Sequence, residues 1–162
     1  MILGKVYLLP MLLHEEGWDS IPSDIVKWIQ QCDAFFVENE KTTRRYFKKL
    51  WRAMVIEDYT WCTIHKVEAE QIEQFKALLN EGKNIGIISE AGCAGVADPG
   101  QILIGIAQEM GVSVKPYLGP NSILLALMAS GMNVQLFQFH CYLPIDNIER
   151  KKKIQALEQD MR

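Results

Sequence analysis

Cysteine, proline and glycine are all sparse in this sequence, with four, six and eleven residues among 162. The four cysteines lie far apart and form no C-x-x-C pair, which argues against a disulfide framework and against a zinc site. Proline and glycine are too few for a low-complexity, disordered chain. No apolar run approaches the ~20 residues that a membrane-spanning helix needs. The sequence therefore predicts a folded globular protein without a membrane span.

The first residues do not have the pattern of a signal peptide, and the sequence has no strong charge of either sign. Residues 1–13 contain a lysine and no small-residue cleavage site, so we predict no signal peptide and a cytoplasmic location. Seventeen basic and twenty acidic side chains give a net charge of −3 with neutral histidines. This balance excludes a globally basic protein that coats nucleic acid, but it permits a local basic face. His14, His65 and His140 show no metal-ligand spacing, and we expect no metal site.

Short apolar runs alternate with helical patterns along the chain. The predicted strands cover residues 2–9, 34–37, 84–89, 112–118 and 136–143, and a weaker extended segment covers 55–64. A first helix is predicted after residues 22–24, with Ser23 or Asp24 as its cap, and further helices cover 41–54, 68–80, 101–110, 123–130 and 148–162. Strands that are almost continuously apolar are typical of a parallel sheet covered on both faces. The predicted fold class is α/β.

The last part of the sequence differs from the rest. The segment 148–162 is a charged helical pattern with few apolar residues, and no later segment follows against which it could pack. The predicted strand 136–143 likewise has no partner downstream. We therefore expect either a truncated chain or a second domain that is supplied from elsewhere.

The strongest candidate for a binding loop is residues 89–100, SEAGCAGVADPG, which directly follow a predicted strand. Ligands of parallel α/β sheets bind at the carboxyl ends of the strands, and small residues let the backbone approach a ligand closely. The loop has no G-K-[ST] motif, and Glu90 and Asp98 would repel a phosphate. Carboxylates among small residues suit a ligand with hydroxyls, an amine or a positive charge, such as S-adenosylmethionine. The alternative is a flexible connection that binds nothing.

A second candidate loop, Gly119-Pro120-Asn121-Ser122, leads into a predicted helix at the same edge of the sheet. Free N–H groups at a helix N-terminus can hold a carboxylate, such as that of a methionine moiety. Asn121 or Ser122 could instead simply cap the helix, and the two roles are compatible.

A stripe of basic residues marks the predicted helix 41–54. Its members recur at intervals of three and four and share one helix face; they are Lys41, Arg44, Arg45, Lys48, Lys49 and Arg52. No acidic residue lies between the first and the last, so we expect these charges to lack i,i+4 compensation. A solvated helix face normally mixes signs, and the stripe therefore favours a polyanionic partner.

Three segments together resemble a known family. Residues 89–100 resemble the S-D-A-G-x-P-x-x-S-D-P-G signature of the tetrapyrrole methylase superfamily, in particular of its 16S rRNA (cytidine-2′-O)-methyltransferase branch. Residues 115–132 (KPYLGPNSILLALMASGM) and 37–47 (VENEKTTRRYF) resemble two other segments of that branch. Residues 139–144 resemble the F-x-G-F-L-P segment that opens the family's second domain.

The resemblance implies two α/β domains, usually in a homodimer, with S-adenosylmethionine bound in the cleft between the domains. Residues 1–117 would form the first domain, and 118–162 would be the incomplete beginning of the second. By position, the cofactor-binding residues would be Pro10, Ser89, Glu90, Ala91, Gly92, Val96, Asp98, Asn121, Ser122, Tyr142 and Leu143.

The sequence also departs from the branch at several positions. The first strand runs into Pro10-Met11-Leu12-Leu13-His14 where the branch has P-T-P-I-G-N. Glu90 stands where aspartate is expected, and Asn121 stands in the place of a serine. These changes indicate a divergent subgroup.

The preferred interpretation is a methyltransferase that acts on a ribose 2′-hydroxyl of small-subunit ribosomal RNA. Such an enzyme must align the acceptor, the methyl group and the sulfonium, and must help the hydroxyl lose its proton. We expect Glu38 to orient or deprotonate the acceptor and the basic stripe to neutralise RNA phosphates; Glu38 could instead only cap the next helix. Two alternatives stay open at this point, a tetrapyrrole (precorrin-type) methylase and a non-catalytic binding or assembly protein.

Overall fold

The computed structural model describes residues 2–64 and 69–160. The chain divides into two units, Met1–Ala129 and Ser130–Arg162. The first contains the sheet and all but one of the helices named below, and the second contains the remaining helix. The predicted domain boundary after residue 117 stays a prediction.

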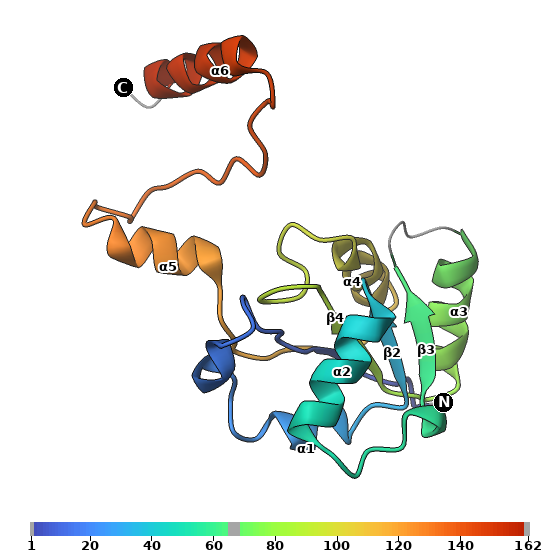
Figure 1. Cartoon of the computed structure of the whole chain (residues 1–162). Coiled ribbons are helices and arrows are strands. Elements are labelled where there is room, and N and C mark those ends of the chain that lie inside the picture. Colours follow the sequence, from blue (N-terminus) through green and yellow to red (C-terminus); the bar gives the residue numbers. More distant parts are fainter. Residues whose placement is uncertain (1, 65–68, 161–162) are drawn as a thin grey trace. The chain divides into compact units, whose positions relative to one another are not determined.

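The first unit is built on a five-stranded sheet (Figure 1). Its strands are β1 (Val6–Leu8), β2 (Ala34–Val37), β3 (Thr60–Thr63), β4 (Ile85–Ile88) and β5 (Val114–Pro116). They lie in the order β3-β2-β4-β1-β5, and every pairing is parallel. The predicted parallel α/β sheet is therefore confirmed.

The helices of the described chain agree with the predicted positions, with differences at their ends. They are α1 (Ile25–Ile29), α2 (Glu40–Leu50), α3 (Ala69–Asn80), α4 (Gly100–Glu109), α5 (Ser122–Ala129) and α6 (Asn147–Asp160), with short 3-10 helices at Gly17–Ser20 and Ile56–Asp58. Asp24 is the N-cap of α1, but its side chain makes no capping hydrogen bond. Within residues 2–64 and 69–160, no helix has the length and apolar character to cross a bilayer. The predicted helix start at Glu68, the predicted helix end at 161–162 and His65 lie outside the described residues.

The predicted helix 41–54 is shorter in the structure, because α2 ends at Leu50. Trp51 leaves the helical region of backbone conformation, with φ −137° and ψ 88°. The Lys48 ammonium then donates hydrogen bonds to the carbonyl oxygens of Arg52 and Met54, at 2.9 and 2.8 Å. A basic side chain thus caps this turn, as is common near helix C-termini.

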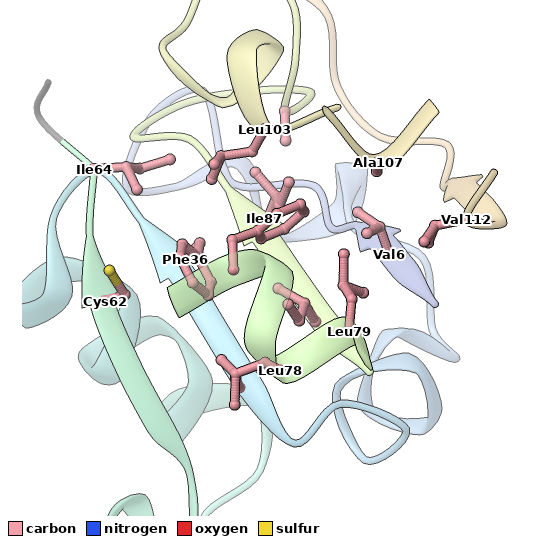
Figure 2. Packing of buried hydrophobic residues seen from close by; sticks show 14 residues of the cluster. Val6, Phe36, Cys62, Ile64, Leu78, Leu79, Ile87, Leu103, Ala107 and Val112 are labelled. Atoms are coloured by element: carbon pink, nitrogen blue, oxygen red, sulfur yellow. The ribbon is translucent and has the colours of Figure 1, made fainter. Parts of the chain in front are cut away.

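Both faces of the sheet are buried, because alternate residues of each strand point to opposite sides. Phe36 and Ile87 belong to a cluster with side chains of α3 and α4, including Phe75 and Leu103 (Figure 2). On the other face, the neighbouring residues Phe35 and Val37 pack with side chains of α1 and α2. The continuous apolar runs of the central strands follow from this double burial.

The connections that follow neighbouring strands diverge beside β4. The chain runs from β1 through α1 to β2 and through α2 to β3 on one face, then returns through α3 to β4 and through α4 to β5 on the other. The connection after β4 therefore leaves toward the opposite face from the connections after its two neighbours, β1 and β2. Ligands of open α/β sheets bind where neighbouring connections diverge in this way.

One predicted strand is wrong. Residues 136–143 form no strand, and their side chains are exposed, Leu136 to 93%. A single strand satisfies its backbone groups only by pairing with a neighbour. The apolar run is present in the sequence, but the described part of the second unit contains no strand with which it could pair.

Candidate functional site

Backbone and side-chain hydrogen bonds join three strand ends at the carboxyl edge of the sheet. Met11, after β1, and Gly92, after β4, exchange two backbone hydrogen bonds of 2.8 and 3.1 Å. The Glu38 carboxylate, after β2, accepts a hydrogen bond from the backbone N–H of Glu90. The predicted catalytic residue Glu38 therefore lies against the predicted cofactor loop, 52 positions away in the sequence.

The loop 89–100 has an ordered backbone and one open side. Gly92 and Gly95 have positive φ values of 72° and 84°, and Ala97 has φ 59°, which is rare for a residue with a Cβ atom. Ala91 and Val96 are exposed. Ser89 is buried, and its hydroxyl donates to the Ala91 carbonyl oxygen at 3.0 Å. Ala94, in the middle of the loop, is buried in the core cluster, whereas Ala91, Val96 and Ala97 are exposed, so the loop is only partly core packing.

The Asp98 carboxylate is directed at its own loop. It accepts hydrogen bonds from the backbone N–H groups of Gly95 and Gly100 at 2.6 and 2.8 Å. Burial raises the pKa of this carboxyl above its ordinary value, although the loop N–H groups act in the opposite direction and lower it. Asp98 thus fixes the shape of the loop, and direct contact with a cofactor stays a prediction.

The second predicted loop, residues 119–122, packs against Pro10 and against the loop 89–100. A Cβ atom on Gly119 would lie 2.1 Å from the Cβ atom of Pro10, and one on Gly92 would lie 3.1 Å from the Pro120 carbonyl oxygen. The Asn121 side-chain oxygen accepts from the N–H groups of Ile123 and Leu124 at 3.0 and 3.1 Å. The capping role is therefore confirmed for Asn121, and a ligand-binding role of Asn121 and Ser122 stays a prediction.

The two remaining predicted cofactor residues lie in the second unit. Tyr142 and Leu143 are 87% and 38% exposed, in a segment without regular secondary structure. Their role at a cleft floor stays a prediction.

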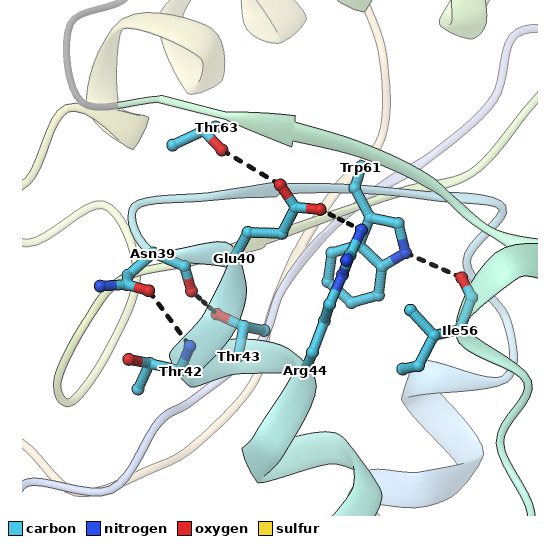
Figure 3. Close-up of polar contacts among 8 residues, drawn as sticks. All are labelled: Asn39, Glu40, Thr42, Thr43, Arg44, Ile56, Trp61 and Thr63. Atoms are coloured by element: carbon cyan, nitrogen blue, oxygen red, sulfur yellow. Dashed lines mark hydrogen bonds and ion pairs between the residues drawn. The ribbon is translucent and has the colours of Figure 1, made fainter.

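The start of α2 carries a polar network around Glu40 (Figure 3). Asn39 caps the helix, with its side-chain oxygen accepting from the Thr42 N–H at 3.1 Å. Glu40 forms an ion pair with Arg44, and the Arg44 guanidinium lies 4.9 Å from the centre of the Trp61 ring. The expectation that the basic residues lack acidic partners is therefore wrong for Arg44, because the acidic residue one turn earlier compensates it.

The six predicted RNA-binding residues thus fall into two groups. Arg44 pairs with Glu40 and Lys48 caps the helix end, so both are engaged within the fold. The other four are exposed; they are Lys41, Arg45, Lys49 and Arg52. Arg52 lies beyond the end of α2, and the basic face of the helix itself is narrower than the spacing predicts.

A cleft of about 410 Å³ opens between the β1–α1 connection and α2. Its lining residues are Met11, Leu12, Leu13, His14, Glu15, Trp18, Thr42, Arg45, Tyr46, Lys49 and Glu90. Among them, Glu90 belongs to the predicted cofactor loop, and Arg45 and Lys49 belong to the predicted basic stripe. Sequence reasoning missed Trp18 and the segment 11–15, because a non-periodic connection gives no pattern that places it against a distant helix.

Tyr46 is a buried residue that lines this cleft. Its buried hydroxyl donates a hydrogen bond to the Pro10 carbonyl oxygen at 3.1 Å, and its ring centre lies 5.8 Å from that of Trp18. Burial raises the pKa of Tyr46 above its ordinary value, because the buried phenolate would lose its hydration.

We expect Tyr46→Phe to lower the free energy of unfolding by about 1 kcal/mol, because the Pro10 carbonyl oxygen loses a buried donor while the ring packing is kept. Tyr46→Ala should cost about 3–5 kcal/mol, because the packing is lost as well. Urea denaturation of the two variants measures both values. Equal losses would contradict a separate contribution of the hydroxyl.

The chain was compared with known proteins, and no family model matches it. Ribosomal RNA small subunit methyltransferase I of Escherichia coli O157:H7 is 34% identical over 162 aligned residues, which cover 98% of this chain and 54% of that protein. The protein of the same name from Bacillus subtilis (strain 168) is 29% identical over 158 residues, which cover 97% and 52%. The chain is a relative of these ribosomal RNA methyltransferases. It spans about half the length of these curated relatives.

The fold agrees with this relationship. A crystal structure of the methyltransferase CobJ matches with a TM-score of 0.58 over 95% of this chain and 62% of that chain, at 16% sequence identity. The predicted resemblance to ribosomal RNA methyltransferases is confirmed by these relatives, and the predicted fold class is confirmed by the CobJ structure.

Part of the predicted loop fits the cofactor S-adenosylmethionine. The exposed Glu90 carboxylate, which lines the cleft, suits a hydroxyl or an ammonium group, and the exposed residues Ala91 and Val96 leave room beside the backbone. Both oxygens of Asp98 accept hydrogen bonds from the loop itself, and its contact with a cofactor stays a prediction. Within residues 2–64 and 69–160, no group of three or more potential metal ligands occurs.

Proposed function

We propose that this chain supplies the S-adenosylmethionine loop and the acceptor side of a methyltransferase that modifies a ribose 2′-hydroxyl in small-subunit ribosomal RNA. The observation that carries the proposal is the hydrogen bond from the Glu90 N–H to the Glu38 carboxylate, because Glu90 also lines the cleft that Arg45 and Lys49 line. This places a carboxylate, a small-residue loop and exposed cations along one crevice of the sheet. The name of the relatives from E. coli and B. subtilis supports ribosomal RNA as the substrate.

Bound S-adenosylmethionine would supply the methyl group. Glu90, Ala91 and Val96 would hold it from the open side of the loop, and Asp98 keeps that loop in shape. Ser89, Gly92 and Pro10 are buried, and Gly92 is hydrogen-bonded to Met11, the residue after Pro10, so these residues would form the base of the site. Asn121, Ser122, Tyr142 and Leu143 complete the proposed set from the segments that follow β5.

Glu38 has two tasks in this proposal. Its carboxylate positions the loop through the Glu90 N–H, and it takes the proton that the acceptor hydroxyl loses as the oxygen–carbon bond forms. A carboxylate at the end of β2 can serve both because the strand fixes its backbone while the side chain reaches the next strand end.

The exposed cations Lys41, Arg45, Lys49 and Arg52 would contact RNA phosphates, and the affinity should fall with rising salt. We further propose a cytoplasmic homodimer, as is usual in the family. The apolar side chains Leu124, Leu125 and Met128 of α5 are more than half exposed, which supports an apolar partner surface on this helix.

Titration calorimetry with S-adenosylmethionine tests the cofactor proposal directly on this chain. Heat of binding to the wild-type chain is the expected result, and no binding at millimolar ligand would instead favour a non-catalytic binding or assembly protein. Incubation with unmethylated small ribosomal subunits or with a precorrin tests the substrate. Methyl incorporation into the precorrin alone would overturn the RNA proposal.

Glu38 variants separate the two tasks of this residue. We expect Glu38→Gln to bind S-adenosylmethionine with less than a threefold change, because the amide oxygen still accepts from the Glu90 N–H, but to lose methyl transfer by at least 100-fold. Glu38→Ala should lose both, because the loop loses its acceptor. Calorimetry and methyl incorporation measure the two quantities, and full turnover of the glutamine variant would exclude Glu38 as the base.

A further inference from the structure

The cleft beside α2 is lined by an aromatic ring, two cations and two carboxylates. We propose that it takes a single unstacked nucleotide of the RNA, with the base against Trp18, the phosphate on Arg45 and Lys49, and the ribose toward Glu90. This inference rests on the proposed function, since it places the acceptor nucleotide beside the cofactor loop, but its test does not depend on the cofactor.

Trp18 provides an aromatic surface that solvent can reach. It lies in the 3-10 helix Gly17–Ser20 and is half-buried, and the Tyr46 ring lies beside its own. The ammonium of the exposed Lys49 lies 5.2 Å from the centre of the indole ring. The ammonium covers this ring, so a stacking base would displace the flexible lysine side chain, which can then reach the phosphate of the same nucleotide.

The charges of the cleft set the orientation of the ligand. Arg45 and Lys49 are one helical turn apart on α2, and both line the cleft. The ion pairs of the described chain involve other cations, namely Arg44, Lys76 and Lys83. Glu15 and Glu90 come from other segments that line the cleft; their carboxylates would repel a phosphate but accept hydrogen bonds from ribose hydroxyls. The phosphate therefore belongs at α2 and the ribose at the carboxylates.

The size of the cleft favours one nucleotide. Its volume of about 410 Å³ lies in the lower part of the ~300–1,000 Å³ range of small-molecule sites. A duplex cannot enter such a space, and enzymes that act on a nucleotide inside a folded nucleic acid take it out of the stack. A free nucleotide has the same chemistry as a nucleotide extruded from RNA, so the experiment must distinguish these two sources.

The experiment measures the fluorescence anisotropy of two labelled RNA hairpins that differ only in one unpaired, bulged residue. We expect the wild-type chain to bind the bulged hairpin at least tenfold more tightly than the paired one. Trp18→Ala should reduce that preference to less than threefold, and Trp18→Phe, which keeps an aromatic ring, should restore most of it. Arg45→Ala and Lys49→Ala should each weaken binding by about 5–10-fold and lower the salt dependence by about one phosphate contact.

Lys27→Ala is the matched control, because Lys27 is an exposed lysine of α1 outside the cleft. Its affinity should stay within twofold of the wild-type value. The inference is overturned if the two hairpins bind equally well to the wild-type chain, or if Arg45→Ala and Lys49→Ala behave like Lys27→Ala. Circular dichroism checks that each variant is folded. If Trp18→Ala does not fold, Trp18→Phe and Arg45→Ala still test the inference.

Two further titrations separate this inference from its alternatives. Nucleoside 5′-monophosphates should bind at least 100-fold more weakly than the bulged hairpin, and equal affinity would show that the ligand is a free nucleotide. S-adenosylmethionine should bind the Trp18 variants as it binds the wild-type chain. A bulge preference that depends on Trp18 without any binding of S-adenosylmethionine would overturn the proposed cofactor and leave the nucleotide site standing.

Discussion

Gly119→Ala is expected to lower the free energy of unfolding by about 1–3 kcal/mol, because the added methyl group has no space. A Cβ atom at this position would lie 2.1 Å from the Cβ atom and 3.0 Å from the Cγ atom of Pro10. Pro10 is buried and its ring is rigid, so it cannot rotate away as a flexible side chain would. The connections after β1 and β5 must therefore move apart. Thermal unfolding should show this as a melting temperature lower by roughly 3–10 °C.

A glycine-to-alanine substitution in α4 serves as a control, because it should change the free energy of unfolding in the opposite direction. Gly105 lies in the middle of α4, is exposed and has no neighbouring atom within 4 Å of an added Cβ atom. Gly105→Ala should raise the free energy of unfolding by about 0.5–1 kcal/mol, because alanine has the higher helix propensity. If Gly119→Ala is as stable as the wild-type chain, the close approach of the two connections is wrong.

Asp98→Ala is expected to release the loop 89–100 from its present shape. The carboxylate accepts from Gly95 and Gly100, and hydrogen bonds to a charged group contribute about 1.5–3 kcal/mol each. Because Ala97 has a positive φ that favours glycine, the loop depends on such contacts to keep its conformation. We expect S-adenosylmethionine affinity to fall by at least tenfold, and hydrogen exchange of the loop amides to become faster.

Asp98→Asn is the conservative comparison. The asparagine side chain keeps one oxygen acceptor and removes the buried charge, and burial is what raises the pKa of Asp98. We therefore expect this variant to lose much less affinity than the alanine variant, within about fivefold of the wild-type value. Calorimetry on both variants measures the difference. A loss of the same size in both would show that the loop needs both oxygen acceptors, because the amide NH2 group of asparagine cannot accept from Gly95 or Gly100.

These expectations depend on contacts between segments that are far apart in the sequence. The loop after β4 could be predicted as a binding loop from its small residues, and its position at a strand end is confirmed. The contact between Glu38 and Glu90 could not, since it depends on β2 and β4 being neighbours. Hydrophobic periodicity states that a segment is buried, but it does not state which segment lies beside it.

In the basic stripe, too, the sequence predicted which residues share a helix face but not which partners they have. The spacing of its residues placed cations on α2, but the partners of Arg44 and Lys48 depend on where the helix begins and ends. Glu40 lies just before the predicted helix start and belongs to α2, where it compensates Arg44. An error of one residue at a helix end is common, and here it changes which charges are available.

The sequence by itself determined the elements whose residues are continuously apolar or amphipathic, such as β2, β4 and the face of α2. It also determined the small-residue loop and the family resemblance, because both are properties of contiguous residues. Only the tertiary structure decided that residues 136–143 form no strand, that Asp98 folds back on its own loop, and that Trp18 lies beside Lys49. Each of these depends on a partner from elsewhere in the chain, and strand pairing, burial and ring contacts are interactions between elements that no local pattern specifies.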